Sequence, residues 1–221
     1  MIQARYRQDY DGEFVLLETR IVNGKKVQQR DWVPNVVENY HISDRAACIG
    51  SRTDLEQFDF KRLQRHRGGL LGKKRLQTYG TGDLWKDMTF DFVTTNDRGQ
   101  IQEIVKTDCA DKSTVHTSAR LCVEFSGRFY LIPFQPVLDE LALNLYLAAF
   151  DGHNEIYMLG YNNETPGKTS AWIENVNQVL AAYYDIKFIL VGTESNMPTV
   201  WRNNKNVACL PYNKFISYCD V

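Results

Sequence analysis

Runs of apolar residues bounded by turn residues divide the chain into short elements of mixed type. Phe14–Val22 and Lys25–Val33 have strand-like composition, and they are separated by Asn23-Gly24. This pair favours a type I′ turn, because both central residues of that turn need positive φ. The pattern predicts a β-hairpin near the N-terminus that ends at Pro34.

Further strands and helices follow along the chain. The predicted strands are Ala46–Ile49, Leu70–Tyr79, Phe90–Thr95, Arg128–Ile132, Glu155–Leu159 and Lys187–Val191. The predicted helices are Leu55–His66, which has weak periodicity, Val137–Phe150, which is apolar on nearly every face, and Ser170–Tyr184. Six residues of the last helix form one apolar stripe: Trp172, Ile173, Val176, Val179, Leu180 and Tyr183. A strand, a helix and a strand at this spacing predict a βαβ unit with parallel strands.

These elements predict one α/β domain over residues 1–221. We expect a Rossmann-like, mostly parallel sheet flanked by helices in residues 45–221, with residues 1–44 as an N-terminal hairpin extension. A length of 221 residues, with 43% apolar and 24% charged residues, is typical of a globular chain with a substantial core.

The composition favours a cytoplasmic protein without a bound metal. The polar N-terminus does not resemble a signal peptide, and no apolar run is long enough for a membrane span. Five cysteines are scattered without a Cys-x-x-Cys pair, and the four histidines lack the spacing of metal ligands. We therefore expect no tightly bound cofactor, although a loosely held divalent cation stays open. The sequence makes no prediction of oligomeric state.

A basic run interrupts the otherwise acidic chain. Residues 61–75 hold seven of the 26 Lys and Arg residues and no acid, although the net charge of the whole chain is −1. A solvated surface is one interpretation of this run, and a contact to phosphate or nucleic acid is the other. The residues predicted to make that contact are Arg65, Arg67, Lys73, Lys74 and Arg75.

Glycine and polar residues follow two of the predicted strands. In open parallel sheets, ligands bind outside the carboxyl ends of the strands. Gly50, Ser51 and Arg52 follow one strand, and Gly160 and Asn162 follow another, so we expect these residues to bind a nucleotide. The alternative is that glycine ends these strands for steric reasons alone.

Asp97 is the candidate catalytic residue. It follows the apolar strand Phe90–Thr95, where a carboxylate can act as general base toward a hydroxyl. The alternative is an ordinary turn, because Asn-Asp-Arg-Gly is good turn chemistry. His116 and His153 are further candidate bases.

The order of these motifs resembles a known group of enzymes. "CIGS", "FVTTND", and "LALNLYLAAFDG" running into "NEIYMLGYN" are similar to small Rossmann-like glycosyltransferases of the bacterial sialyltransferase-like type, over residues 45–192. The resemblance implies a nucleotide sugar as co-substrate, held in the loop after the first strand. It also implies a catalytic histidine after the last matching strand; no histidine follows His153, so Asp97 is expected to replace it.

Together these features predict a glycosyltransferase that moves a sugar from a nucleotide-sugar donor to an acceptor hydroxyl. The basic run adds DNA as an expected partner, with a modified base as acceptor, as in the T-even-like bacteriophages. Two alternatives stay open. One is a non-enzymatic module that binds nucleic acid or protein on a Rossmann-like core, and the other is a nucleotide hydrolase or nuclease.

Overall fold

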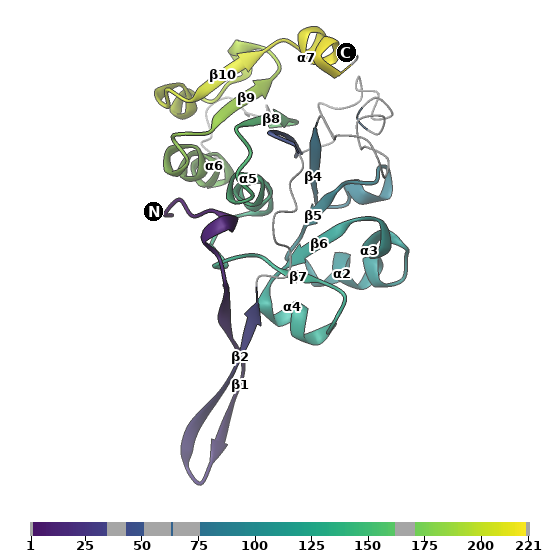
Figure 1. Ribbon diagram of the computed structural model, residues 1–221, viewed down its shortest axis with the longest axis vertical. Helices are drawn as coiled ribbons and strands as arrows, with labels where there is room; N and C mark the ends of the chain where they lie inside the picture. Colours follow the sequence, from purple (N-terminus) through teal and green to yellow (C-terminus); the bar gives the residue numbers. More distant parts are fainter. Residues whose placement is uncertain (1, 35–42, 51–62, 64–75, 162–170, 220–221) are drawn as a thin grey trace.

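An eight-stranded sheet runs through the centre of the molecule, in the order β10-β9-β8-β3-β4-β5-β6-β7 (Figure 1). Every pair of neighbouring strands in it is parallel. This computed structural model describes residues 2–34, 43–50, 63, 76–161 and 171–219. The prediction of an α/β fold with a mostly parallel sheet, flanking helices and an N-terminal hairpin is confirmed.

The strands of the sheet are β3 (Arg45–Ile49), β4 (Gln77–Thr81), β5 (Phe92–Thr94), β6 (Thr114–Thr117), β7 (Tyr130–Leu131), β8 (Glu155–Leu159), β9 (Lys187–Val191) and β10 (Val207–Leu210). The described helices are α2 (Arg98–Val105), α3 (Cys109–Lys112), α4 (Ala119–Glu124), α5 (Glu140–Phe150), α6 (Ala171–Ala182) and α7 (Tyr212–Cys219). Short 3₁₀ turns lie at Arg7–Asp9, Leu84–Lys86, Glu194–Asn196 and Thr199–Asn203. No helix in the described part of the chain is long and apolar enough to cross a membrane.

The helices cover the two faces of the sheet with two separate cores. On one face, α5 and α6 pack against side chains such as Cys48, Tyr79 and Phe92. On the other face, α2, α3 and α7 pack against Val93, Val115 and their neighbours. This alternation follows from the strand geometry, since successive residues of a strand point to opposite faces.

Helix α5 is the most deeply buried helix described. Every residue from Ala142 to Phe150 is buried, as its continuous apolar sequence predicts. Each fully buried Leu or Phe contributes roughly 1.5–3 kcal/mol through loss of apolar surface from water. The helix begins later than predicted: the Asp139 side chain caps it by accepting from Ala142 N at 3.0 Å, and Val137 is exposed.

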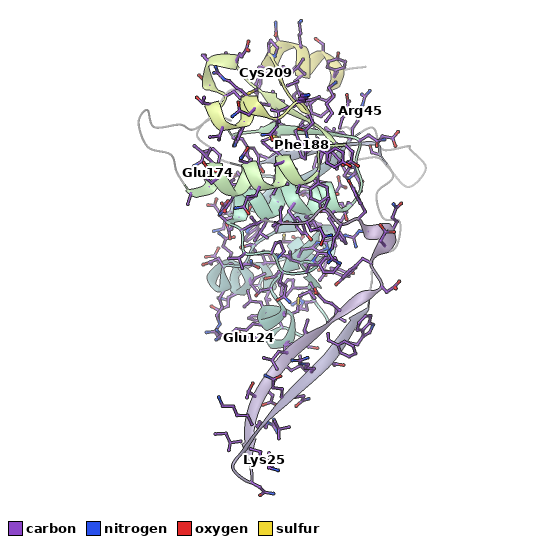
Figure 2. All side chains as sticks on the ribbon, turned by 90° about the vertical axis from the view of Figure 1, so that its left-hand side faces the viewer. Lys25, Arg45, Glu124, Glu174, Phe188 and Cys209 are labelled. Atoms are coloured by element: carbon purple, nitrogen blue, oxygen red, sulfur yellow. The ribbon has the colours of Figure 1, made fainter. Side chains whose placement is uncertain are left out.

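The β-hairpin lies apart from the sheet. β1 (Gly12–Val22) and β2 (Lys25–Pro34) pair only with each other, in antiparallel register, and extend away from the body of the molecule (Figure 1). The predicted turn is confirmed, with φ of 52° at Asn23 and 76° at Gly24. Side chains stand on both sides of the ribbon down to Lys25 at its tip (Figure 2).

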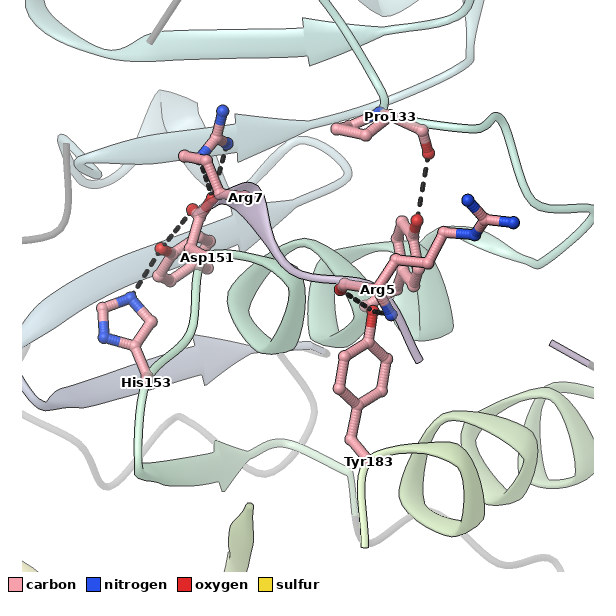
Figure 3. A network of polar contacts seen from close by, with 8 residues as sticks. Arg5, Arg7, Pro133, Asp151, His153 and Tyr183 are labelled. Atoms are coloured by element: carbon pink, nitrogen blue, oxygen red, sulfur yellow. Dashed lines mark hydrogen bonds and ion pairs between the residues drawn. The ribbon is translucent and has the colours of Figure 1, made fainter. Parts of the chain in front are cut away.

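A buried polar network holds the N-terminal segment against the sheet (Figure 3). The Arg7 guanidinium forms an ion pair with Asp151, and both side chains are buried. Asp151 also accepts a hydrogen bond of 2.7 Å from the Tyr79 hydroxyl, which lies 2.8 Å from His153 Nε2. Because Asp151 and His153 lie between α5 and β8, this network lies at the amino edge of the sheet.

Candidate site at the carboxyl edge of the sheet

The sheet changes direction between β3 and β8. From β3 the chain adds β4 to β7 on one side, and it then returns to add β8 to β10 on the other. Leu63, between β3 and β4, packs in the core on the α2 face, whereas α6, which follows β8, packs on the opposite face. Leu63 and α6 therefore lie on opposite faces of the sheet. In open α/β sheets this arrangement opens a crevice that binds ligands.

Gly50 and Gly160 lie side by side at this switch point. Gly50 N donates a hydrogen bond of 2.8 Å to Leu159 O. A Cβ added at Gly50 would lie 2.9 Å from Leu141 Cδ2 and 3.1 Å from Gly160 O, so a side chain has no room there. Gly160 has a φ of 72°, which favours glycine. Local packing at Gly50 and backbone conformation at Gly160 therefore already explain why these residues are glycine. Their contact with a nucleotide stays a prediction.

The amino end of α5 lies at the same edge. The Tyr161 hydroxyl, just after β8, donates to Leu141 O at 3.0 Å. Asn144, the polar residue within the buried part of α5, donates from Nδ2 to Tyr79 O at 3.2 Å and to Ile49 O at 3.4 Å. These contacts fix α5 against the carboxyl halves of β3 and β4.

Glu140, the first residue of α5, is a carboxylate that the sequence analysis missed. Its Oε1 accepts a hydrogen bond of 2.8 Å from the Thr95 hydroxyl, just after β5. Burial raises the pKa of Glu140, and the negative charge of Asp97 adds to the increase. The one signal in the sequence is its position after Asp139 at a helix start. This signal is not specific, because acidic residues are common in the first turn of any helix.

Asp97 lies on the same edge, between β5 and α2. Its Oδ1 accepts a hydrogen bond of 2.7 Å from Gln100 N, so the side chain caps α2. Asp97 N donates to the Thr95 hydroxyl at 3.1 Å, which links Asp97 through Thr95 to Glu140. The side chain of Asp97 is exposed, and a role as base stays a prediction beside the capping role that the structure gives it.

The two candidate histidines are structural. His116 and His153 are both buried, with 1% and 0% exposure. Burial lowers the pKa of His116 to about 3, and the positive charge of Arg7 adds to the decrease. Neither ring reaches the surface of the sheet edge, so neither can act as base on a ligand there.

The other predicted site residues lie outside the described residues. In the sequence, two of them follow Gly50 and one follows Tyr161; the remaining five belong to the basic run. They are Ser51, Arg52, Asn162, Arg65, Arg67, Lys73, Lys74 and Arg75.

Fold and site together define an α/β protein with a doubly wound parallel sheet and two carboxylates near its switch point. Among solved structures, the sialyltransferase CstII from Campylobacter jejuni, determined in complex with the substrate analogue cytidine-5′-monophosphate, is similar to this chain. The TM-score is 0.42 at 12% sequence identity, over 66% of this chain and 78% of that chain. No protein-family model and no curated protein matches the sequence.

Proposed function

We propose that this chain is a glycosyltransferase that transfers a sugar from a nucleotide-sugar donor to an acceptor hydroxyl. The observation that carries the proposal is the layout of the carboxyl edge. Gly50 and Gly160 mark the switch point, and Asp97 and Glu140 lie beside β5 on the same edge. β3 and β5 are two strands apart, or about 10 Å. A donor with its nucleotide at the switch point would extend its sugar toward these carboxylates.

In the proposed reaction, a carboxylate removes the proton of the acceptor hydroxyl. The acceptor oxygen then bonds to the anomeric carbon, while the bond from that carbon to the donor phosphate breaks. The nucleotide leaves with the electron pair. A base works best when its pKa is near the working pH. The raised pKa of Glu140 therefore makes it a stronger candidate than its sequence position suggests, and Asp97 is the second candidate.

Binding is tested first, by thermal unfolding of the purified chain with nucleotides and nucleotide sugars. A ligand that binds only the folded state raises the unfolding temperature by mass action. We expect the unfolding temperature to rise with one nucleotide, and also with the diphosphate or monophosphate sugar of that same nucleotide. If none of these compounds raises the unfolding temperature, the chain does not bind a nucleotide donor and the proposal is wrong.

Transfer is then tested with Glu140→Gln and Asp97→Asn. Gln can still accept from Thr95 and Asn is as good a helix cap as Asp, so both variants should fold. Loss of a general base lowers the rate on the order of 10²-fold or more. Glu103→Gln is the matched control, because Glu103 is an exposed carboxylate on α2 that pairs with Lys86. Equal rates for all three variants would show that neither carboxylate acts as base.

The acceptor to test first is a hydroxyl on a modified base of phage DNA. Support for this acceptor class comes from the basic run at residues 61–75, at the level of sequence alone. Small sugar acceptors form the comparison. Transfer to a small acceptor but not to DNA would retain the transferase and exclude the DNA-base acceptor.

A further inference from the structure

The hairpin of β1 and β2 exposes large apolar side chains to water. Residues 19–32 are exposed without a break, so both faces of the outer ribbon lie in water. An isolated two-stranded hairpin is marginally stable in water. Large apolar side chains nevertheless point outward: Ile21 is 74% exposed, Phe14 68% and Leu16 50%. Such a surface is typical of an interaction site.

The register places these side chains on one face. Cross-strand partners share a face, and successive residues of β2 alternate between faces. In β1 the register shifts between Leu16 and Glu18, so that Leu16 and Ile21 lie on the same face. Phe14 faces Trp32, and their rings meet edge to face with centroids 4.9 Å apart. Leu16 faces Arg30, and Ile21 faces Lys26. We name this surface the Arg30 face.

The polar residues of the Arg30 face are basic or neutral. Besides Lys26 and Arg30, it carries the pair Thr19 and Gln28, and Arg30 donates to Gln28 Oε1 at 3.0 Å. The acids of the ribbon lie on the opposite face: Glu13, Glu18 and Asp31.

The opposite face differs because its three acids more than offset its two basic residues, Arg20 and Lys25. There, Arg20 forms an ion pair with Glu18. On the Arg30 face, neither Lys26 nor Arg30 has an ion pair within the described residues. The two faces carry the same number of basic residues, so only the Arg30 face presents uncompensated positive charge.

We propose that the hairpin is a double-stranded DNA-binding arm that places its Arg30 face in the major groove. The major groove is about 12 Å wide and admits a two-stranded β-ribbon. Arg pairs with guanine, Gln with adenine, and apolar groups contact the methyl group of thymine. A second copy of this chain fits less well, because a symmetric contact between two Arg30 faces would oppose like charges. The inference does not depend on the proposed transferase activity, since DNA binding needs no sugar donor.

The test compares two double variants of the full chain with the same change of charge. Lys26→Gln with Arg30→Gln alters the Arg30 face, and Arg20→Gln with Lys25→Gln alters the opposite face. Binding is measured by fluorescence anisotropy on a labelled mixed-sequence DNA duplex of about two helical turns. All four positions are exposed on the ribbon, and circular dichroism checks that each variant is folded.

We expect the Lys26 and Arg30 variant to bind the duplex about tenfold or more weakly, while the control loses much less. Each lost phosphate contact lowers the slope of log K against log salt by about 0.9. Neutralising both residues should therefore reduce the slope by up to about 2. No binding to the duplex, or an equal loss in both variants, would overturn the inference.

The same assay distinguishes other nucleic acids and a second copy. Duplex RNA has a deep, narrow major groove that side chains cannot read, so we expect it to bind more weakly. Tighter binding of single-stranded DNA would instead indicate base stacking on Phe14 and Trp32, and would overturn groove binding. A dimer in sedimentation experiments that Ile21→Ser abolishes, without DNA binding, would assign the ribbon to self-association.

Discussion

The buried ring of His116 should make the stability of this protein depend on pH. The ring is 1% exposed and lies between Phe92 and Tyr130, with centroids 6.0 and 5.7 Å away. Burial, with the charge of Arg7 as a second cause, lowers its pKa from 6.5 to about 3. The folded state therefore keeps the ring neutral at a pH where the unfolded chain binds a proton.

The sign and size follow from proton linkage. A lowered histidine pKa means that stability is complete above the unfolded pKa and is lost as the pH falls from about 6.5 toward about 3. At about pH 5, protonation favours the unfolded chain by roughly 2 kcal/mol, whereas at about pH 7.5 the effect is close to zero. This is a large fraction of the stability of a typical domain.

The assay is urea unfolding of the native chain and of His116→Phe at the two pH values, followed by circular dichroism. Phenylalanine keeps the ring between Phe92 and Tyr130 but cannot bind a proton. Other titrating groups act on both proteins alike, so the native chain should lose roughly 2 kcal/mol more than the variant on acidification. If both proteins lose the same free energy of unfolding, His116 is not buried as a neutral ring.

Two other substitutions test the packing and the buried ion pair. A Cβ at Gly80 would lie 2.5 Å from two ring carbons of the buried Phe90. Gly80→Ala should therefore lower the free energy of unfolding by about 1–3 kcal/mol, which urea unfolding measures as a lower midpoint. An unchanged midpoint would contradict this packing. Asp151→Asn removes the negative charge that pairs with the buried Arg7 guanidinium and should cost about 3–5 kcal/mol, with a smaller cost when Arg7→Met is added. Additive losses in this double-mutant cycle would show that the pair does not act as a unit.

The sequence predicted the elements whose pattern is local. Glu155–Leu159 and Lys187–Val191 are continuous apolar runs, and their predicted bounds match β8 and β9. The hairpin was predicted because Asn23-Gly24 determines its turn chemically. β6 was missed, because Thr114–Thr117 is short and contains a histidine that only burial between rings turns into a core residue. The four residues of β6 carry no sign that rings of other strands will surround His116.

The candidate site was predicted only where it follows a strand directly. Gly50, Gly160 and Asp97 each follow an apolar strand. Ligands bind at the carboxyl ends of parallel strands, so this position made the three residues candidates. Glu140 follows a loop instead, and it reaches the edge because α5 begins beside Thr95, 45 residues earlier in the chain. This contact depends on how α5 packs across the whole sheet, which a local sequence pattern does not predict.

The two edges of the sheet differ in a way that separates stability from the proposed chemistry. At the amino edge, Arg7, Asp151 and Tyr79 are buried and bonded to each other, so a change there removes partners from buried groups. At the carboxyl edge, Asp97 is exposed and Glu140 carries a desolvated carboxylate, whose charge costs stability. Removing that charge with Glu140→Gln should therefore leave the fold as stable or more so, although it removes the proposed base.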